Sequence, residues 1–397
     1  MRLLVIGAGM MGSAAACDMA CAGQVESVTL ADSDKKRARD AAARLNKLNG
    51  SRKVRAAELD AGNEKAAAKL MRSHQAALSA VPYFCNLGLA RAAVEARCHF
   101  ADLGGNHTVV CQEYALARKA ERRGVALAPD CGLSPGMASI LAGELMRRLG
   151  KNAAALKIYV GGLPARPRPP FNYQLAFSVE GLINEYAEAA CVLRRGKITT
   201  AEPLTEIETF RLRGFPPLEA FHTSGGTSTL PETFQGRVDE CFEKTLRYPG
   251  HAAALRALYD LGLFRTEKMR FGKAEISPRE LTARLMCEAF AGQEPDVTIL
   301  VVEAHEKPVG GWRALLGPRN VPAPRVLSFT MVDRSDSATG MTSMMRTTAW
   351  PASIVVQMLA SGQIGKRGGI RQEVDIPAAD FLDAMAARGI NIEYEER

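Results

Sequence analysis

The chain has 397 residues, a formal net charge of +8 at pH 7, and a composition of 47% hydrophobic and 24% charged residues. This length exceeds that of one ordinary core, and the composition excludes a disordered or fibrous protein, so we expect a soluble protein of at least two domains. The basic residues are scattered and no apolar run reaches the length of a membrane span, which argues against binding to nucleic acid or a membrane. Nine cysteines without a CxxC pair predict free thiols in a reducing cytoplasm, and we expect no metal site.

The N-terminal segment carries a glycine motif between a strand and a helix. The apolar run 3–6 is typical of a strand buried on both faces of a parallel sheet, and the small residues 13–21 read as a helix. Between them, three glycines at GxGxxG spacing permit a tight turn, close approach of the backbone to a pyrophosphate, and packing of the helix on the strand. We therefore predict a dinucleotide site whose residues in this loop are Gly7, Gly9, Met10, Met11 and Gly12.

An acidic residue at the end of the second predicted strand bears on the choice of cofactor. Asp32 follows the strand 27–31, where a carboxylate accepts hydrogen bonds from the ribose hydroxyls and repels a 2′-phosphate. We therefore predict NAD rather than NADP. Two features leave the alternative open, because Asp32 could instead cap the helix predicted from Lys35, and the cations 35–37 would tolerate a phosphate.

Strand and helix patterns alternate up to residue 130. Further strands are predicted at 54–59, 76–81, 98–103 and 125–128. With the first two strands they form the set of a doubly wound, Rossmann-type α/β domain, which binds its ligand beyond the carboxyl ends of its parallel strands. The residues at these ends are further candidates for cofactor binding: Asp60, Val81, Pro82, Asp102 and Leu103.

After residue 130 the pattern changes to strands with few helices. The strands are predicted at 156–160, 174–178, 191–193, 207–212, 218–223, 238–246, 297–304 and 326–332. Such a run predicts an α+β domain with a mixed or antiparallel sheet, which we place at 131–336. The remaining residues, 337–397, read as helices, the first of them kinked or restarted at Pro351. Their apolar face needs a partner, so we expect them to pack back on the nucleotide domain, 1–130.

Several segments of the chain are specific enough to indicate a family. They are 130–136 (DCGLSPG), 160–164 (VGGLP), 170–173 (PFNY), 177–181 (FSVEG), 221–226 (FHTSGG), 244–251 (KTLRYPGH) and 346–351 (RTTAWP). Over nearly its whole length the chain resembles the saccharopine dehydrogenase family, and within it the L-lysine 6-dehydrogenase branch. The resemblance implies an NAD(P)-dependent oxidoreductase that acts on a C–N bond of a small amino-acid substrate and forms a homodimer or a larger homo-oligomer.

This chemistry requires a proton acceptor and a clamp for a zwitterion. Hydride leaves the carbon that bears the amine, so the nitrogen must first lose its proton to a base. The predicted catalytic residues are His222, Lys244 and Glu180, and the predicted substrate-binding residues are Arg247, Tyr173, Glu185 and His251. Arg247 suits a carboxylate because its planar fork binds one in a bidentate manner. Asp102 and Cys131 are weaker candidates for proton transfer, and a structural role remains the alternative for His222, Lys244 and Arg247.

The resemblance, weighed with these residues, leaves three functions open. The first is NAD-dependent oxidative deamination of the side-chain amine of L-lysine to allysine, which cyclises to piperideine-6-carboxylate, with release of ammonia. The second is oxidation of saccharopine, whose glutaryl arm would need further cations, such as Arg166, Arg168, Arg211 and Arg213. The third is a catalytically silent NAD-binding sensor, because a fold does not determine a function. Such a sensor would have no use for the charged residues of the second domain.

Overall fold

The computed structural model describes residues 1–292, 294–308 and 323–397, and they fall into two units. The first unit comprises Met1–Ile140 and Ser335–Ile390, and the second comprises Leu141–Arg334 and Asn391–Arg397. The first boundary therefore lies about ten residues later than the sequence pattern placed it. The reason is that the short kinked segment η2 (Leu133–Met137) packs against α12 (Ser343–Ser361) of the first unit.

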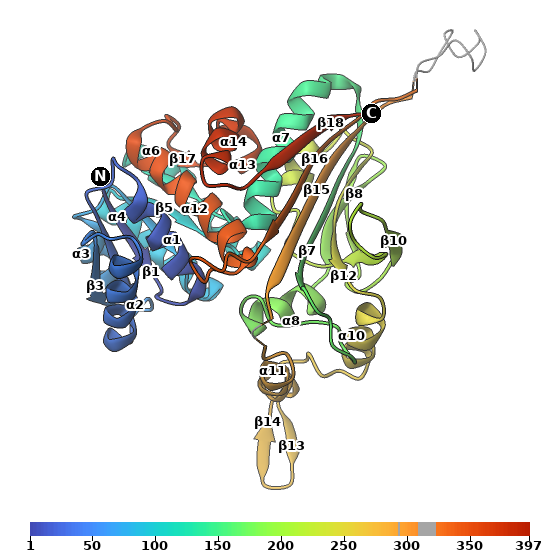
Figure 1. Ribbon diagram of the computed structural model, residues 1–397, viewed down its shortest axis with the longest axis horizontal. Coiled ribbons are helices and arrows are strands. Elements are labelled where there is room, and N and C mark those ends of the chain that lie inside the picture. Colours follow the sequence, from blue (N-terminus) through green and yellow to red (C-terminus); the bar gives the residue numbers. More distant parts are fainter. Residues whose placement is uncertain (293, 309–322) are drawn as a thin grey trace. The chain divides into compact units, whose positions relative to one another are not determined.

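The first unit is built on a parallel sheet of seven strands in the order β17-β6-β5-β4-β1-β2-β3. The strands are β1 (Arg2–Ile6), β2 (Ser27–Asp32), β3 (Val54–Glu58), β4 (Ala76–Ser79), β5 (His99–Asp102), β6 (Ala126–Ala128) and β17 (Gly368–Gly369). Helices lie on both sides of the sheet (Figure 1), as predicted for a doubly wound fold. The order reverses between β1 and β4, and such a switch point is where a nucleotide binds.

The helices of the first unit follow the predicted alternation with the strands. They are α1 (Met10–Cys21), α2 (Lys35–Leu48), α3 (Glu64–Met71), η1 (Tyr83–Cys85), α4 (Asn86–Ala96), α5 (His107–Ala115), α6 (Ala117–Arg122), α12, α13 (Gln372–Asp375) and α14 (Ala378–Ala386).

Helix α12 is a single helix that includes Pro351. It packs on α1, where Asp18 accepts a hydrogen bond from Ser353 (2.6 Å) and forms an ion pair with Arg388 (2.7 Å). Helix α12 also contacts β4 and β5, and the same C-terminal segment supplies β17 to the sheet edge.

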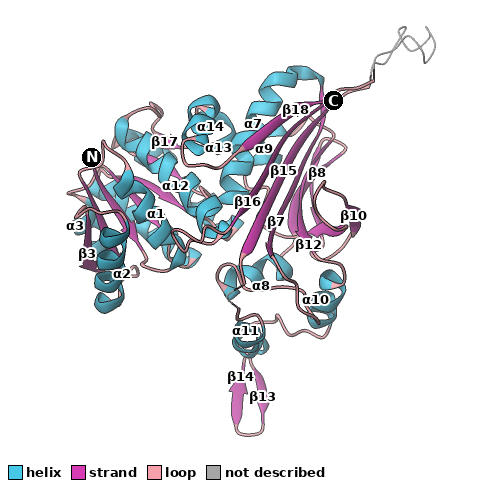
Figure 2. Ribbon diagram, viewed as in Figure 1, coloured by secondary structure: helices cyan, strands magenta, loops and turns pink. Residues whose placement is uncertain are grey.

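The second unit is built on a mixed sheet of nine strands, drawn in magenta in Figure 2. Its strands are β7 (Ala153–Pro164), β8 (Ala190–Arg194), β9 (Lys197–Ala201), β10 (Glu208–Phe210), β11 (Leu218–His222), β12 (Glu240–Arg247), β15 (Asp296–Glu306), β16 (Val326–Arg334) and β18 (Ile392–Glu396). Strands β7 and β12 pair in parallel, and the other neighbours are antiparallel. This is the mixed sheet that the sequence predicted, although the predicted strand at 174–178 is absent from the described structure.

Helices and one small hairpin complete the second unit. They are α7 (Ala138–Leu149, which begins in the first unit), η3 (Gly150–Asn152), α8 (Val179–Ala187), α9 (Leu230–Phe234), α10 (His251–Asp260), α11 (Pro278–Ala289) and the hairpin β13 (Met269–Phe271)–β14 (Ala274–Ile276). The hairpin extends beyond α11 (Figure 1). Helix α11 begins after Ser277, whose side chain accepts a hydrogen bond from the backbone N–H of Glu280. None of the described helices is both long and apolar enough to cross a bilayer.

The register of β11 and β12 determines which side chains share a face of this sheet. Phe221 lies opposite Thr245, and His222 lies opposite Lys244. Cross-strand partners project to the same face, and successive residues alternate between faces. Phe221 packs with residues of α8, α10 and α11, whereas Leu246 packs in a separate cluster with residues of β7 and β15. We call the first of these the helix-covered face, and it carries the candidate substrate site.

Candidate functional site

The glycine loop of the first unit has the geometry of a phosphate-binding turn. Gly7 has a φ of +105°, and a Cβ at Gly12 would lie 1.8 Å from the carbonyl oxygen of Gly7, so neither position admits a side chain. At Gly9 a Cβ would meet no atom within 4 Å, so the loop is open there. Helix α1 begins at Met10 without a side-chain cap. Its N-terminal N–H groups and the open loop therefore fit the pyrophosphate of a dinucleotide.

Asp32 lies beside this loop and is bound to it. Its Oδ2 accepts a hydrogen bond from the Ala8 N–H (2.8 Å), and its Oδ1 accepts one from the Asp34 N–H (2.9 Å). The cap of α2 is Asp34, which accepts from the Arg37 N–H (3.0 Å), so Asp32 does not have the capping role that the sequence left open. The Arg37 guanidinium lies 3.7 Å from the Asp32 carboxylate, and the Arg37 side chain is 59% exposed. A carboxylate and an exposed guanidinium thus lie together next to the glycine loop.

The other predicted cofactor residues lie at the carboxyl edge of the same sheet. The side chain of one of them, Asp102, is buried. Asp60, Val81, Pro82 and Leu103 lie within three residues of the ends of β3, β4 and β5. Asp102 is fully buried, and its Oδ1 accepts hydrogen bonds from the N–H groups of Gly104 (2.6 Å) and Asp130 (3.2 Å). Its carboxylate therefore stabilises this loop, and a role of Asp102 in cofactor binding stays a prediction that this geometry does not support.

Asp102 also shares its buried environment with a second acid that the sequence did not single out. Glu113 on α5 is 1% exposed, and burial together with the charge of Asp102 raises the pKa of Glu113 far above its usual value. Burial also raises the pKa of Asp102, to about 6. Glu113 thus keeps its proton at neutral pH, whereas Asp102 titrates just below it. Burial likewise raises the pKa of the Cys131 thiol, so Cys131 is neutral there and unsuited to accept a proton.

Arg247 is the centre of a buried polar cluster on the helix-covered face of the second unit. It is 3% exposed, and its guanidinium lies over the ring of Tyr173, with 4.8 Å from Cζ to the ring centroid. Its Nε donates to the Tyr186 hydroxyl (3.3 Å), and its Nη2 lies 3.9 Å from the Glu185 carboxylate. The Tyr173 hydroxyl is buried without a hydrogen-bond partner among the described residues. The structure therefore brings together the predicted substrate residues Arg247, Glu185 and Tyr173.

His251 belongs to the same cluster, as predicted, but its hydrogen bonds give it a positioning role. Its Nδ1 lies 2.8 Å from the Phe171 carbonyl oxygen, which can only accept, so Nδ1 carries the hydrogen. Nε2 is then the acceptor for the Tyr186 hydroxyl, at 2.9 Å. Burial, and next the charge of Arg247, lower the pKa of His251 to about 3. The neutral imidazole thus orients Tyr186, which in turn holds Arg247.

Two acids on this face have raised pKa values. Glu185 leaves 30% of its side chain exposed, and burial of its carboxylate raises the pKa to about 7, against the opposing effect of the Arg247 charge. Glu243 is 2% exposed and accepts hydrogen bonds from Thr223 (3.1 Å) and Thr245 (3.3 Å). Burial raises the pKa of Glu243 to about 8, and the charge of Glu185 contributes to this rise as a smaller cause. Both acids can therefore exchange a proton near neutral pH.

The structure does not bring the predicted catalytic residues into this cluster. His222 and Lys244 project from the opposite face of the sheet, because each is one residue away from a side chain of the helix-covered face. Lys244 donates to the Glu206 carbonyl oxygen (2.7 Å), and His222 contacts the Glu206 carboxylate (3.1 Å). Glu180 lies on α8 and forms an ion pair with Arg279 (3.0 Å). These three residues therefore have other partners than Arg247, and their catalytic role stays a prediction that this geometry does not support.

The sequence contained a signal for the groups that were missed. Residues 243, 245 and 247 alternate along one strand, and a period of two puts Glu243 on the side of Arg247 and Lys244 on the other. Counting in steps of two from Arg247 would have selected Glu243 rather than Lys244. Tyr186 and Thr223 carried no comparable signal, because they reach the cluster from α8 and from the end of β11.

A cavity of about 450 Å³ lies beside Tyr173. Its lining includes Arg166, Arg168 and Glu294, together with aromatic and proline side chains. Arg168 forms an ion pair with Glu294, so its charge is already compensated. The other two arginines considered for a glutaryl arm, 211 and 213, are exposed and do not line this cavity. Among the described residues that line it, the cavity thus offers one uncompensated cation, Arg166, whereas a glutaryl arm carries two carboxylates.

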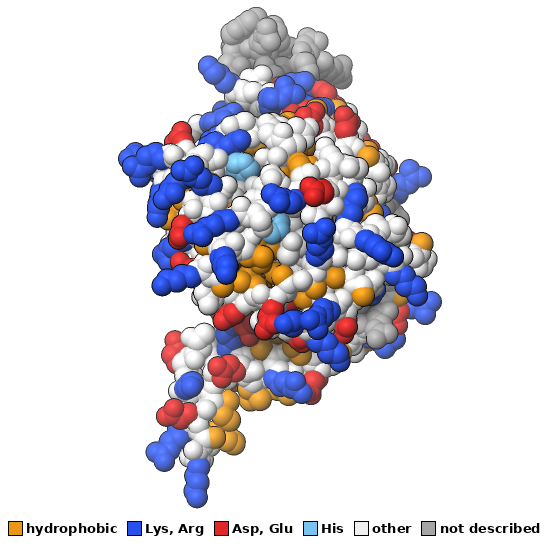
Figure 3. Space-filling model, turned by 90° about the vertical axis from the view of Figure 1, so that its left-hand side faces the viewer, with side chains coloured by type: hydrophobic (Ala, Val, Ile, Leu, Met, Phe, Trp, Pro, Cys, Tyr) orange, Lys and Arg blue, Asp and Glu red, His pale blue; other side chains and the backbone are white. Residues whose placement is uncertain are grey.

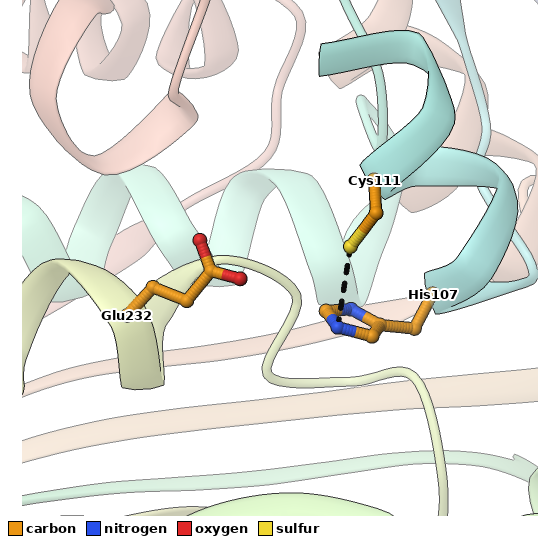
Figure 4. Close-up of side chains that lie close together, drawn as sticks. All are labelled: His107, Cys111 and Glu232. Carbon is orange, nitrogen blue, oxygen red and sulfur yellow. Dashed lines mark hydrogen bonds between the residues drawn. The ribbon is translucent and has the colours of Figure 1, made fainter. Parts of the chain in front are cut away.

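Two potential metal ligands lie on α5 of the first unit. The Cys111 Sγ and the His107 Nε2 are 3.5 Å apart, one helical turn from each other (Figure 4). Glu232, also drawn there, belongs to the second unit. Two ligands from one helix do not make a metal site, and structural sites generally need four.

On the face drawn in Figure 3, cationic side chains are spread among polar and apolar ones rather than gathered in one stripe.

The fold and the loop geometry define a class of protein, namely a Rossmann-type dinucleotide-binding chain with a second, mixed-sheet α/β unit. Comparison with protein families identifies the family within this class. The saccharopine dehydrogenase NADP binding domain matches residues 3–128, and the saccharopine dehydrogenase C-terminal domain matches residues 132–390. The chain therefore belongs to the saccharopine dehydrogenase family, as its motifs indicated.

The named relatives share less than a quarter of their residues with this chain over the matched segments. It is 23% identical over 254 residues to saccharopine dehydrogenase [NADP(+), L-glutamate-forming] of Pyricularia oryzae, a match covering 62% of this chain and 56% of that protein. It is 24% identical over 306 residues to the mitochondrial alpha-aminoadipic semialdehyde synthase of Mus musculus, covering 70% of this chain and 32% of that protein. The apo saccharopine dehydrogenase (L-Glu forming) of Saccharomyces cerevisiae shares the fold, with a TM-score of 0.77 and 17% identity over 100% of this chain and 99% of that chain.

Proposed function

We propose that this chain oxidises the side-chain amine of L-lysine to allysine and releases ammonia, as in the L-lysine 6-dehydrogenase branch that its motifs resemble. The observation that carries this proposal is the cluster of Arg247, Glu185 and Tyr173 on the helix-covered face. A buried guanidinium next to a carboxylate is the complement of the α-carboxylate and α-ammonium of a free amino acid. A sensor that only binds a nucleotide would not need it.

Each residue of the cluster has a distinct part in this proposal. Arg247 binds the substrate carboxylate with its guanidinium. The Tyr186 hydroxyl holds this guanidinium through Nε, and Nη2 is directed toward Glu185. Glu185 binds the adjacent ammonium, and Tyr173 supplies its unpaired hydroxyl and a ring surface under Arg247. A nicotinamide cofactor supplies the hydride acceptor when it is bound at the glycine loop. The amine must lose its proton before hydride leaves, and water must then hydrolyse the imine.

We propose NAD as the cofactor, on the strength of Asp32. Its carboxylate is fixed beside the glycine loop by the Ala8 N–H, where it would repel a 2′-phosphate. The relatives of Pyricularia and Schizosaccharomyces are named as NADP(+) enzymes, and the exposed Arg37 could serve a phosphate. The cofactor is therefore the part of the proposal on which this chain would differ from those relatives.

Oxidation of saccharopine is the second candidate, favoured by the names of the relatives and by Arg166 at the cavity. The experiment that separates the candidates follows absorbance of the reduced cofactor with lysine, saccharopine and other amino acids, each with NAD and with NADP. Lysine turnover with NAD supports the proposal, and turnover of saccharopine alone selects the second candidate. Tight NAD binding without turnover of any amino acid would show a silent nucleotide-binding protein.

A further inference from the structure

We propose that Glu243 binds the side-chain ammonium of lysine and takes its proton before hydride transfer. This inference rests on the proposed function and adds to it the missing proton acceptor and the group that selects lysine. Glu243 takes the place of His222 and Lys244, which project from the other face of the sheet.

The position of Glu243 along its strand is the first argument. It lies four residues before Arg247 on β12, so the two side chains share the helix-covered face with their Cα atoms about 13 Å apart. Glu185 reaches the same face from α8, and its charge acts on both residues. The face thus brings a guanidinium and two carboxyls within reach of one another's charges, with Glu185 3.9 Å from Arg247.

Charge complementarity is the second argument. Lysine has one carboxylate and two ammonium groups, and Arg247, Glu185 and Glu243 together supply one guanidinium and two carboxyls. Arg247 and Glu185 satisfy the α-carboxylate and the α-ammonium, which leaves Glu243 for the side-chain ammonium. Saccharopine carries the same number of ammonium groups but three carboxylates, so these residues would supply two cations too few for it. The same three residues therefore favour lysine over saccharopine.

The surroundings of Glu243 are the third argument. Buried carboxylates normally have a cationic partner, yet the hydrogen bonds of Glu243 come from two threonine hydroxyls, and no described side-chain cation forms an ion pair with it. A Cβ at Gly226 would lie 2.5 Å from its Oε2, so the 224–229 loop closes over the carboxyl. That loop has no charged side chain. The charges that face Glu243 are therefore those of Glu185 and Arg247, with neutral His251 and Tyr186 beyond them.

The proton balance follows from this arrangement. Glu243 takes one proton from the ammonium nitrogen, the nitrogen lone pair then forms the imine as hydride leaves the neighbouring carbon for the cofactor, and water releases ammonia from the imine. Burial and the charge of Glu185 raise the pKa of Glu243 to about 8. Such a group is a better base near pH 8 than an ordinary glutamate, because its proton affinity is closer to that of an amine. The rate should therefore rise with pH as Glu243 ionises.

The test compares Glu243→Gln with the wild-type full-length chain. We expect kcat for lysine to fall by about 10²- to 10⁴-fold, the usual contribution of a general base, and the rise of kcat/KM near pH 8 to disappear. Glu243→Asp keeps a carboxyl and should retain the pH dependence at a reduced rate. The matched control is Glu303→Gln, which changes an acid of β15 that pairs with His305 and Arg397 instead.

A binding measurement separates this inference from the proposed function. Calorimetry with lysine and with norleucine, which lacks the side-chain amine, should show that Glu243→Gln weakens lysine at least about tenfold and norleucine less than about twofold. Near-normal kcat in Glu243→Gln with an unchanged pH profile, or equal effects on both ligands, would overturn the role of Glu243. A wild-type chain that does not oxidise lysine would overturn the proposed function, and the difference between lysine and norleucine binding would still decide whether Glu243 recognises an ammonium.

Discussion

Replacing Arg247 with methionine tests the substrate clamp on which the proposed function depends. Methionine keeps much of the length and the apolar contact with Tyr173, and it removes the charge and the donors. Hydrogen bonds to a charged group contribute about 1.5–3 kcal/mol each, and loss of that amount corresponds to a roughly 10- to 150-fold weaker interaction. We therefore expect KM for lysine to rise by this factor. A smaller loss of kcat should accompany it, because the reacting carbon is positioned less well.

The structure also predicts what this change should leave intact. The glycine loop belongs to the other unit, so the dissociation constant for NAD should change less than about twofold. Arg334→Met is the matched control, because Arg334 lies on the same sheet over the Phe215 ring at 5.7 Å and outside the cluster. Steady-state kinetics and fluorescence titration of the cofactor measure both quantities, and thermal melting checks the fold. A KM for lysine within about threefold of the wild type, in a folded variant, would refute the clamp.

Three further predictions concern the first unit. Asp32→Ala should narrow the preference for NAD over NADP by about 10- to 100-fold in kcat/KM, and equal use of both cofactors by the wild type would count against the role of Asp32. A chain that stops at Asp336 should be insoluble, because it lacks α12 and β17, and a soluble NAD-binding fragment would contradict this. Glu113 has a raised pKa in the folded state, so its contribution to the free energy of unfolding is present at low pH and is lost as pH rises above the unfolded value. Glu113→Gln should accordingly lose less stability than the wild type between pH 6 and about pH 9 in urea titrations, and identical losses would show that Glu113 is not protonated.

The local sequence was sufficient for the nucleotide unit because its signals lie close together in the chain. The fully buried run of β1, the glycines and the short helix after them are neighbours, and each imposes its own backbone geometry. The family motifs were equally local, since consecutive residues such as 244–251 need no knowledge of the fold to be compared. The first boundary at 140 and the strand β17 were not predictable in this way. They depend on packing of the distant C-terminal segment on the first unit.

The substrate cluster shows most clearly what the tertiary structure alone decides. The sequence predicted Arg247, Glu185 and Tyr173 as substrate-binding residues, and they lie together, but it also joined Lys244 and His222 to Arg247. Side chains alternate between the two faces of a pleated strand. Lys244 lies three residues before Arg247, so the two side chains project to opposite faces although they are close in sequence. Burial then decided which groups can exchange protons near neutral pH, because the desolvation that raises the pKa of Glu243 exists only after the helices and the 224–229 loop have covered that face.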